Sequence, residues 1–133
     1  EQQFGEEYFD PDEYDYENNR VDTLPTLKKN IKDFDLIDVV KPIIGHSKEV
    51  ASEIENYIDL VFIDGSHTFE SARADYAAWK NKIRVGGILA IHDIYDSELE
   101  GGQAPREIYE KALNEDLMLL KIVNILFVLQ SII

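Results

Sequence analysis

Two acidic residues stand directly after apolar runs in the middle of this chain. Asp64 follows the run LVFI, and Asp93 follows the run ILAI with one histidine between them. If these runs are neighbouring strands, their ends lie about 4.8 Å apart, and the two carboxylates can bind one hard cation such as Mg²⁺, Ca²⁺ or Mn²⁺. The alternative is that both acids cap the helices that follow or accept hydrogen bonds from loop amides.

Two histidines accompany these acids. His67 lies three residues after Asp64 near the start of a helix, where the positive end of the helix dipole disfavours imidazolium and keeps a neutral ring. Such a ring can take a proton from a hydroxyl, and an exposed or capping histidine is the alternative. His92 directly precedes Asp93 and is more typical of a buried, hydrogen-bonded histidine than of a ligand or base. Its side chain can point to the opposite side of the strand end.

A third polar pair, His46 and Ser47, follows another apolar run. Ser47 is a good helix N-cap, with contact to a cofactor as the alternative, and His46 is typical of a solvent-facing turn. The sequence contains neither the Gly-x-Ser-x-Gly of serine hydrolases nor the Gly-x-x-x-x-Gly-Lys of nucleotide-hydrolysing enzymes. The sequence therefore supports neither hydrolysis by a catalytic serine nor nucleotide hydrolysis.

Alternating helix and strand patterns must position these residues. Helices are predicted to begin near Thr23, Ser47, Thr68 and Pro105. Strands are predicted at 39–44, 60–63, 88–91, about 117–122 and about 125–132. The last two strands are joined by so short a link that they must be antiparallel neighbours. Pro42 assigns the first strand to a sheet edge, and Gly86-Gly87 is expected to end the third helix.

The strand pattern also predicts the fold class. The run LVFI is apolar without alternation, as expected of a parallel strand that is covered on both faces. Strands that alternate with helices predict an α/β fold with an open sheet, in which ligands bind beyond the carboxyl ends of the strands. This topology places six candidate residues along one edge of the sheet: His46, Ser47, Asp64, His67, His92 and Asp93.

Composition sets the remaining limits. The chain has 133 residues, the length of one domain, and it contains no cysteine, which excludes disulfides and thiolate metal sites and fits a reducing cytoplasm. A net charge of −14 argues against nucleic acid and anionic membranes, and no apolar run reaches the ~20 residues that span a bilayer. Residues 1–20, rich in carboxylates and aromatic side chains, are predicted to form an acidic arm or loop, and residues 21–133 the domain.

Two segments carry a resemblance to a known family. DLVFIDGSHTFESARADYAAW (59–79), followed by VGGILAIHD (85–93), resembles the class I S-adenosylmethionine-dependent methyltransferases. It is most similar to the subfamily whose fourth strand ends in Ile-Asp-Gly-x-His and whose fifth ends in His-Asp, often found among enzymes that act on sugars and small natural products. The resemblance implies a Rossmann-like sheet, mostly parallel, with a C-terminal antiparallel hairpin. Weaker likeness extends from about residue 20 to the end.

The resemblance also implies an activity and roles for residues. The expected reaction moves a methyl group from S-adenosylmethionine to a hydroxyl of a sugar or small molecule, with assistance from Mg²⁺. Asp64 and Asp93 match the Mg²⁺-binding positions, and His67 matches a position proposed as the base. His46, Ser47 and Asp64 are the expected cofactor contacts, although His46 stands where the family commonly has aspartate.

One part of the family pattern has no counterpart in this sequence. The first strand, its glycine-rich loop and the acid that ends the second strand are absent, so the N-terminal strands of the sheet are expected to be missing. The chain can then be a piece of a longer protein, or a partner chain or a second copy can complete its sheet. Two further alternatives are an interaction module that has lost cofactor binding and a different α/β enzyme that uses the same acids. The expected partner otherwise is a small-molecule acceptor, with neither nucleic acid nor membrane.

Overall fold

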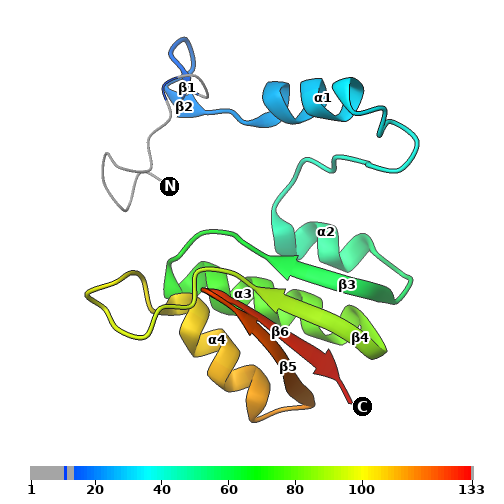
Figure 1. Ribbon diagram of the computed structural model, residues 1–133. Coiled ribbons are helices and arrows are strands. Elements are labelled where there is room, and N and C mark those ends of the chain that lie inside the picture. The colour runs from blue at the N-terminus through cyan, green and yellow to red at the C-terminus, as the bar shows by residue number, and fades with distance from the viewer. Residues whose placement is uncertain (1–10, 12–13, 133) are drawn as a thin grey trace. The chain divides into compact units, whose positions relative to one another are not determined.

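The chain divides into two compact units. The computed structural model describes residue 11 and residues 14–132, and the units are Glu1–Ile44 and Gly45–Ile133 (Figure 1). Most of the acidic arm expected at residues 1–20 lies outside the described residues. Within that range, Tyr14–Asp15 (β1) and Arg20–Val21 (β2) form a small antiparallel sheet.

The first unit also contains one helix, α1, at Leu24–Asp33. Thr23 is its N-cap, as predicted, but the Thr23 side chain makes no capping hydrogen bond. Asp22 takes over that function, because its Oδ1 accepts a hydrogen bond from the backbone N–H of Leu24 at 3.1 Å. Among the residues of α1, only Ile31 is buried.

The prediction of a strand at 39–44 is wrong. This segment forms neither a helix nor a strand, and every one of its residues is exposed. A strand is stabilised by the ladder it forms with a neighbour, and the described strands offer this segment no partner. Pro42 removes one backbone donor as well. Val39 and Ile44 are each 76% exposed.

The second unit is built on a four-stranded sheet. Its strands are Ile58–Ile63 (β3), Ile83–Ile91 (β4), Leu117–Val123 (β5) and Leu126–Ser131 (β6), in the order β3-β4-β6-β5. The β3 and β4 strands are parallel, and the other two pairs are antiparallel, so the sheet is mixed. The predicted C-terminal hairpin is confirmed. The helices of the second unit are Ser47–Glu53 (α2), Phe69–Trp79 (α3) and Ala104–Leu113 (α4).

The glycine pair does not end the third helix. A 3₁₀ turn at Lys80–Lys82 follows α3, and Gly86 and Gly87 lie inside β4, which begins five residues earlier than the run ILAI indicated. Gly86 has a φ of +76°, a conformation that side chains disfavour, and the register between β3 and β4 shifts between Ile58 and Leu60. The glycines therefore mark an irregularity in the strand.

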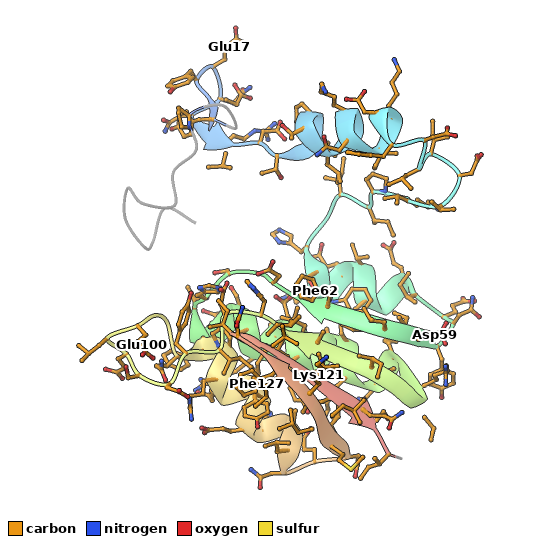
Figure 2. All side chains as sticks on the ribbon, viewed as in Figure 1. Glu17, Asp59, Phe62, Glu100, Lys121 and Phe127 are labelled. Atoms are coloured by element: carbon orange, nitrogen blue, oxygen red, sulfur yellow. The ribbon has the colours of Figure 1, made fainter. Side chains whose placement is uncertain are left out.

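The core lies on one face of this sheet. Val61, Leu89 and Leu129 occupy one row across three strands and pack with Tyr76 of α3 and Ile108 of α4. The expectation that β3 is covered on both faces is wrong, since alternate residues of the strand point the other way. Leu60 is 56% exposed and Phe62, labelled in Figure 2, is 51% exposed.

The β3 strand also lies at an open edge of the sheet. Among the described strands it pairs only with β4. The carbonyl of Ile63 accepts a hydrogen bond from the N–H of His92, at 3.1 Å, so the backbone groups of Ile63 point toward β4. Those of Leu60 and Phe62 point to the open side, because successive residues of a strand alternate. Nowhere in residues 14–132 is a helix long and apolar enough to cross a membrane.

Candidate active site at the carboxyl end of the sheet

The ends of the two parallel strands bring three predicted site residues together. Because Ile63 and Ile91 are partners in the β3–β4 register, the residues just beyond them lie side by side. Asp64, His67 and Asp93 each offer one ligand atom, and these atoms all lie within 4.8 Å of one another. The sequence-based expectation that these acids converge thus agrees with the geometry.

Asp93 is held in an unusual backbone conformation. Its φ is +57°, in the left-handed region that aspartate and asparagine tolerate better than most residues. Its side chain is only 18% exposed, and its Oδ2 lies 3.0 Å from Nε2 of His67. A non-glycine residue in this region costs about 1–2 kcal/mol and is found more often at functional sites than elsewhere.

His67 lies just before α3. Thr68 is the N-cap of this helix, and its hydroxyl accepts a hydrogen bond from the N–H of Ser71 at 3.2 Å. This cap fixes the first turn and sets His67 beside the start of α3. A neutral imidazole that donates from Nε2 to Asp93 carries its lone pair on Nδ1.

His92 lies closer to the acids than the sequence indicated. Its Nδ1 is 3.4 Å from Oδ1 of Asp64 and 3.2 Å from Oδ1 of Asp93. This atom is buried and has no hydrogen-bond partner among the described residues, so it lies within reach of both carboxylates but is aligned with neither. The side chain points into the cluster rather than to the opposite side of the strand end. Adjacency to Asp93 was the only signal for this in the sequence.

Tyr95 was not found by sequence reasoning. Its hydroxyl lies 3.3 Å from Oδ1 of Asp93, so the phenol joins the cluster from the loop after β4. No motif marks this residue, because its approach depends on the path of the loop.

A groove runs beside the open edge of β3 and ends at Asp64. Its volume is about 430 Å³, and it is lined by Leu60, Phe62 and Trp79 on the apolar side and by Ser47 and Asp75 among the polar groups. Apolar walls with a few polar groups are typical of small-molecule sites. Gly65 also lies on this groove, where a Cβ would come within 3.0 Å of Oδ2 of Asp75. Asp75 thus lines the groove and, like Tyr95, was not assigned to the site by sequence reasoning.

Ser47 does not serve as the predicted N-cap of α2, whereas His46 is exposed, as the sequence indicated. His46 rather than Ser47 is the N-cap residue, and Ser47 is the first residue of the helix. The Ser47 hydroxyl accepts a hydrogen bond of 2.7 Å from Nε1 of Trp79, so a partner 32 residues away fixes its position. The structure thus brings Ser47 and Asp64 to one groove, whereas His46 is exposed and does not line it.

A larger hollow of about 570 Å³ lies around the start of β4 and the start of β5, with Tyr57 and Arg84 in its lining. None of the residues of the acid and histidine cluster, which consists of Asp64, His67, His92 and Asp93, lines it. Its lining includes the paired Lys80 and Glu115. Because the predicted site residues converge at the other end of β3, the smaller groove at Asp64 is the better candidate.

The donor set of the cluster fits a divalent cation. Two carboxylates suit Mg²⁺ or Mn²⁺, and imidazole nitrogens extend the range to other first-row metals. The Nδ1 atom of His92 supports this fit, because it is buried without a hydrogen-bond partner among the described residues and lies within 3.4 Å of one oxygen of each carboxylate. In the tautomer with its lone pair on Nδ1, the ring can join the two carboxylates in binding a cation.

The chain is similar to a known protein family and to a solved structure. The model of a family described as "Methyltransferase domain" matches residues 9–94, which is well over half of the chain and includes the whole acid and histidine cluster. Among solved structures, a Clostridium thermocellum protein described as a candidate rRNA methylase matches with a TM-score of 0.63 and 18% sequence identity. The match covers 82% of this chain and 66% of that protein, so a third of the other chain has no counterpart here.

Proposed function

Because the chain belongs to the methyltransferase family whose domain it matches over residues 9–94, we propose that it serves S-adenosylmethionine-dependent methyl transfer to a hydroxyl of a sugar or small molecule. The observation that carries this proposal is the convergence of Asp64, His67 and Asp93 at the carboxyl ends of two parallel strands. Ligands of open α/β sheets bind at this edge.

The groove beside β3 is the proposed cofactor site. S-adenosylmethionine bound there would supply an electrophilic methyl group to the acceptor oxygen, and its sulfur would retain the electron pair of the broken C–S bond. The oxygen of the Ser47 hydroxyl accepts the hydrogen bond from Trp79, so its proton remains available for donation to the nucleobase of the cofactor. Asp64 ends the groove and can accept a hydrogen bond from the cofactor. His46 was expected to contact the cofactor as well, and its exposure gives that role no support.

His67 is the proposed general base. The 3.0 Å contact between its Nε2 and Oδ2 of Asp93 orients the ring and stabilises the positive charge that forms when the ring takes a proton. Nδ1 is then the atom that accepts the proton of the acceptor hydroxyl. A well-placed base of this kind contributes on the order of 10²–10⁴ in rate.

Asp64 and Asp93 are the proposed ligands of Mg²⁺. A bound divalent cation supplies Lewis-acid chemistry that lowers the pKa of a coordinated hydroxyl. Oδ1 of each aspartate faces the same point near His92, whereas Oδ2 of Asp93 faces His67. The two oxygens of Asp93 can thus serve the cation and the base at once.

A small acceptor suits this chain better than RNA. The solved relative is described as a candidate rRNA methylase, but 18% identity carries the fold and not the substrate. The net charge of −14 repels a phosphate backbone, and binding of nucleic acid relies on cationic side chains that neutralise phosphates. We therefore keep a neutral or cationic small molecule as the acceptor.

A non-catalytic interaction module is the second candidate. The open edge of β3 and the exposed Leu60 and Phe62 favour it, because they leave backbone groups and apolar surface for another strand. A second copy or a partner chain that adds a strand here would complete the sheet, as would further residues of a longer protein.

A calorimetric titration of S-adenosylmethionine into the chain, with and without Mg²⁺, tests the proposal. Binding near micromolar that is lost in Asp64→Ala supports the cofactor site, and no binding to a cooperatively folded chain favours the module. In a preparation that turns over, His67→Ala should reduce the rate at least ~100-fold with little change in cofactor affinity. Equal rates in this variant and in the wild type would remove His67 from the mechanism.

A further inference from the structure

The loop after β4 holds its backbone firmly around Tyr95. Ile94 is 4% exposed, and its N–H donates to the carbonyl of Ile125 at 3.0 Å. The carbonyl of Tyr95 accepts a hydrogen bond of 2.9 Å from Nη1 of Arg106, which lies on α4. Both α4 and the C-terminal hairpin therefore fix the position from which the Tyr95 side chain leaves the backbone.

The ring of Tyr95 lies against Gly101 of the same loop. Glu100, labelled in Figure 2, marks this loop. A Cβ placed on Gly101 would come within 2.3 Å of Cδ2 of the Tyr95 ring, which is closer than two carbon atoms can approach. Only glycine at position 101 lets the ring occupy this place. The loop thus fixes the ring as well as the backbone.

The hydroxyl at the end of this ring reaches the acid of the cluster. Oδ1 of Asp93 lies 3.3 Å from the Tyr95 hydroxyl, while Oδ2 of the same carboxylate lies 3.0 Å from Nε2 of His67. The terminal torsion of an aspartate is broad and nearly two-fold, so an unrestrained carboxylate turns readily. Contacts on both oxygens hold one orientation.

We propose that Tyr95 is a positioning residue that holds Asp93 so that Oδ2 faces His67 and Oδ1 faces the proposed cation. This inference rests on the proposed function of the site. The phenol O–H donates to one lone pair of Oδ1 and leaves the other lone pair for a cation, as outer hydrogen-bond donors do for metal-ligating carboxylates. Without the hydroxyl, the carboxylate turns and the tautomer of His67 is no longer fixed.

Two variants remove this hold in different ways. Tyr95→Phe deletes the hydroxyl and keeps the ring, and Gly101→Ala keeps the hydroxyl and displaces the ring. Tyr57→Phe is the matched control, because Tyr57 is 76% exposed and precedes β3 at the other end of the sheet from Asp64. Backbone amide spectra of each variant, compared with wild type outside the loop, report whether the fold is kept.

The first measurement is the side-chain ¹⁵N spectrum of His67 in the metal-free chain at one pH. We expect one dominant tautomer, with Nε2 protonated, in the wild type and in Tyr57→Phe, and a mixture of tautomers in the other two variants. The second measurement is a calorimetric titration with Mn²⁺, in which we expect affinity about 10-fold weaker for Tyr95→Phe.

Unchanged His67 tautomers in Tyr95→Phe would overturn the inference, whatever the metal does. A wild-type chain that does not bind Mn²⁺ would count against the cation in the proposed function, and the His67 spectrum would still decide the role of Tyr95. Failure of the two ideas can therefore be told apart.

Discussion

Replacement of Asp93 by asparagine separates a cation site from an ordinary structural acid. The residue has a φ of +57°, and asparagine tolerates this region as well as aspartate does. Asp93→Asn therefore removes a charge and leaves the turn intact. Because its amide has one acceptor oxygen, the variant also keeps only one of the contacts with Tyr95 and His67, and the change in stability combines both effects. Glu98→Gln, an exposed acid on the same loop, is the matched control.

The magnitude follows from the positions of the two carboxylates. Ligand atoms of Asp64 and Asp93 lie within 4.8 Å, and two like charges at that distance repel by about 3.5 kcal/mol at an effective dielectric constant of about 20. The two side chains are 46% and 18% exposed, so solvent screening reduces this to about 1 kcal/mol. In EDTA, the variant should have an unfolding free energy equal to that of the wild type or higher by up to ~1 kcal/mol.

A divalent cation should reverse that order. Binding to the native state alone adds about 2.7 kcal/mol when the free cation is at 100 times its dissociation constant. The wild type and Glu98→Gln should gain this amount in Mn²⁺, and Asp93→Asn should gain little. Urea denaturation in EDTA and in Mn²⁺, followed by circular dichroism, measures both terms.

One result would refute this reasoning. If Asp93→Asn is less stable than the wild type by more than 1 kcal/mol in EDTA and gains as much as the wild type from Mn²⁺, Asp93 is a structural acid. Its contact with His67 would then be its main contribution, and the proposal of a cation at this site would fall.

Three further predictions concern the scaffold. Leu129→Ala should cost about 2–5 kcal/mol and Leu60→Ala less than about 1 kcal/mol by chemical denaturation, since only the first side chain is fully buried; equal losses would contradict the one-faced core. The hydrogen bond from Lys80 lowers the pKa of Glu115. The contribution of this pair to the free energy of unfolding is therefore present above the unfolded pKa of about 4.3, and it is lost as pH falls through the lower native pKa. Lys80→Met should flatten that loss in unfolding curves between pH 5 and pH 2, and an unchanged pH profile would argue against the pair. Gly87→Ala should lower the thermal midpoint, because a Cβ there would lie 2.9 Å from a backbone oxygen of β4, and a midpoint equal to that of the wild type would show that the strand relaxes.

Local signals in the sequence were sufficient for much of this fold. Thr68 as an N-cap, Pro105 in the first turn of α4 and the short link before Leu126 each depend on neighbouring residues only, and each prediction agrees with the structure. The convergence of Asp64 and Asp93 followed from topology, because parallel neighbouring strands end at the same edge.

Features that depend on distant partners were not predictable. A strand at 39–44 requires a neighbouring strand, and the described residues supply none. Ser47 fits an N-cap by local rules, but the bond from Trp79 gives its hydroxyl another function. The position of Tyr95 depends on Gly101 and Arg106, whose contacts arise only once α4 has packed.

The open edge of β3 leaves a signature in amide hydrogen exchange. The N–H groups of Val61 and Ile63 point into the ladder with β4, whereas those of Leu60 and Phe62 point outward. Protection from exchange should therefore alternate residue by residue along a single strand, slow at odd numbers and fast at even ones. Any chain that adds a strand at this edge would slow the even-numbered amides alone, so two resonances report whether the sheet has been extended.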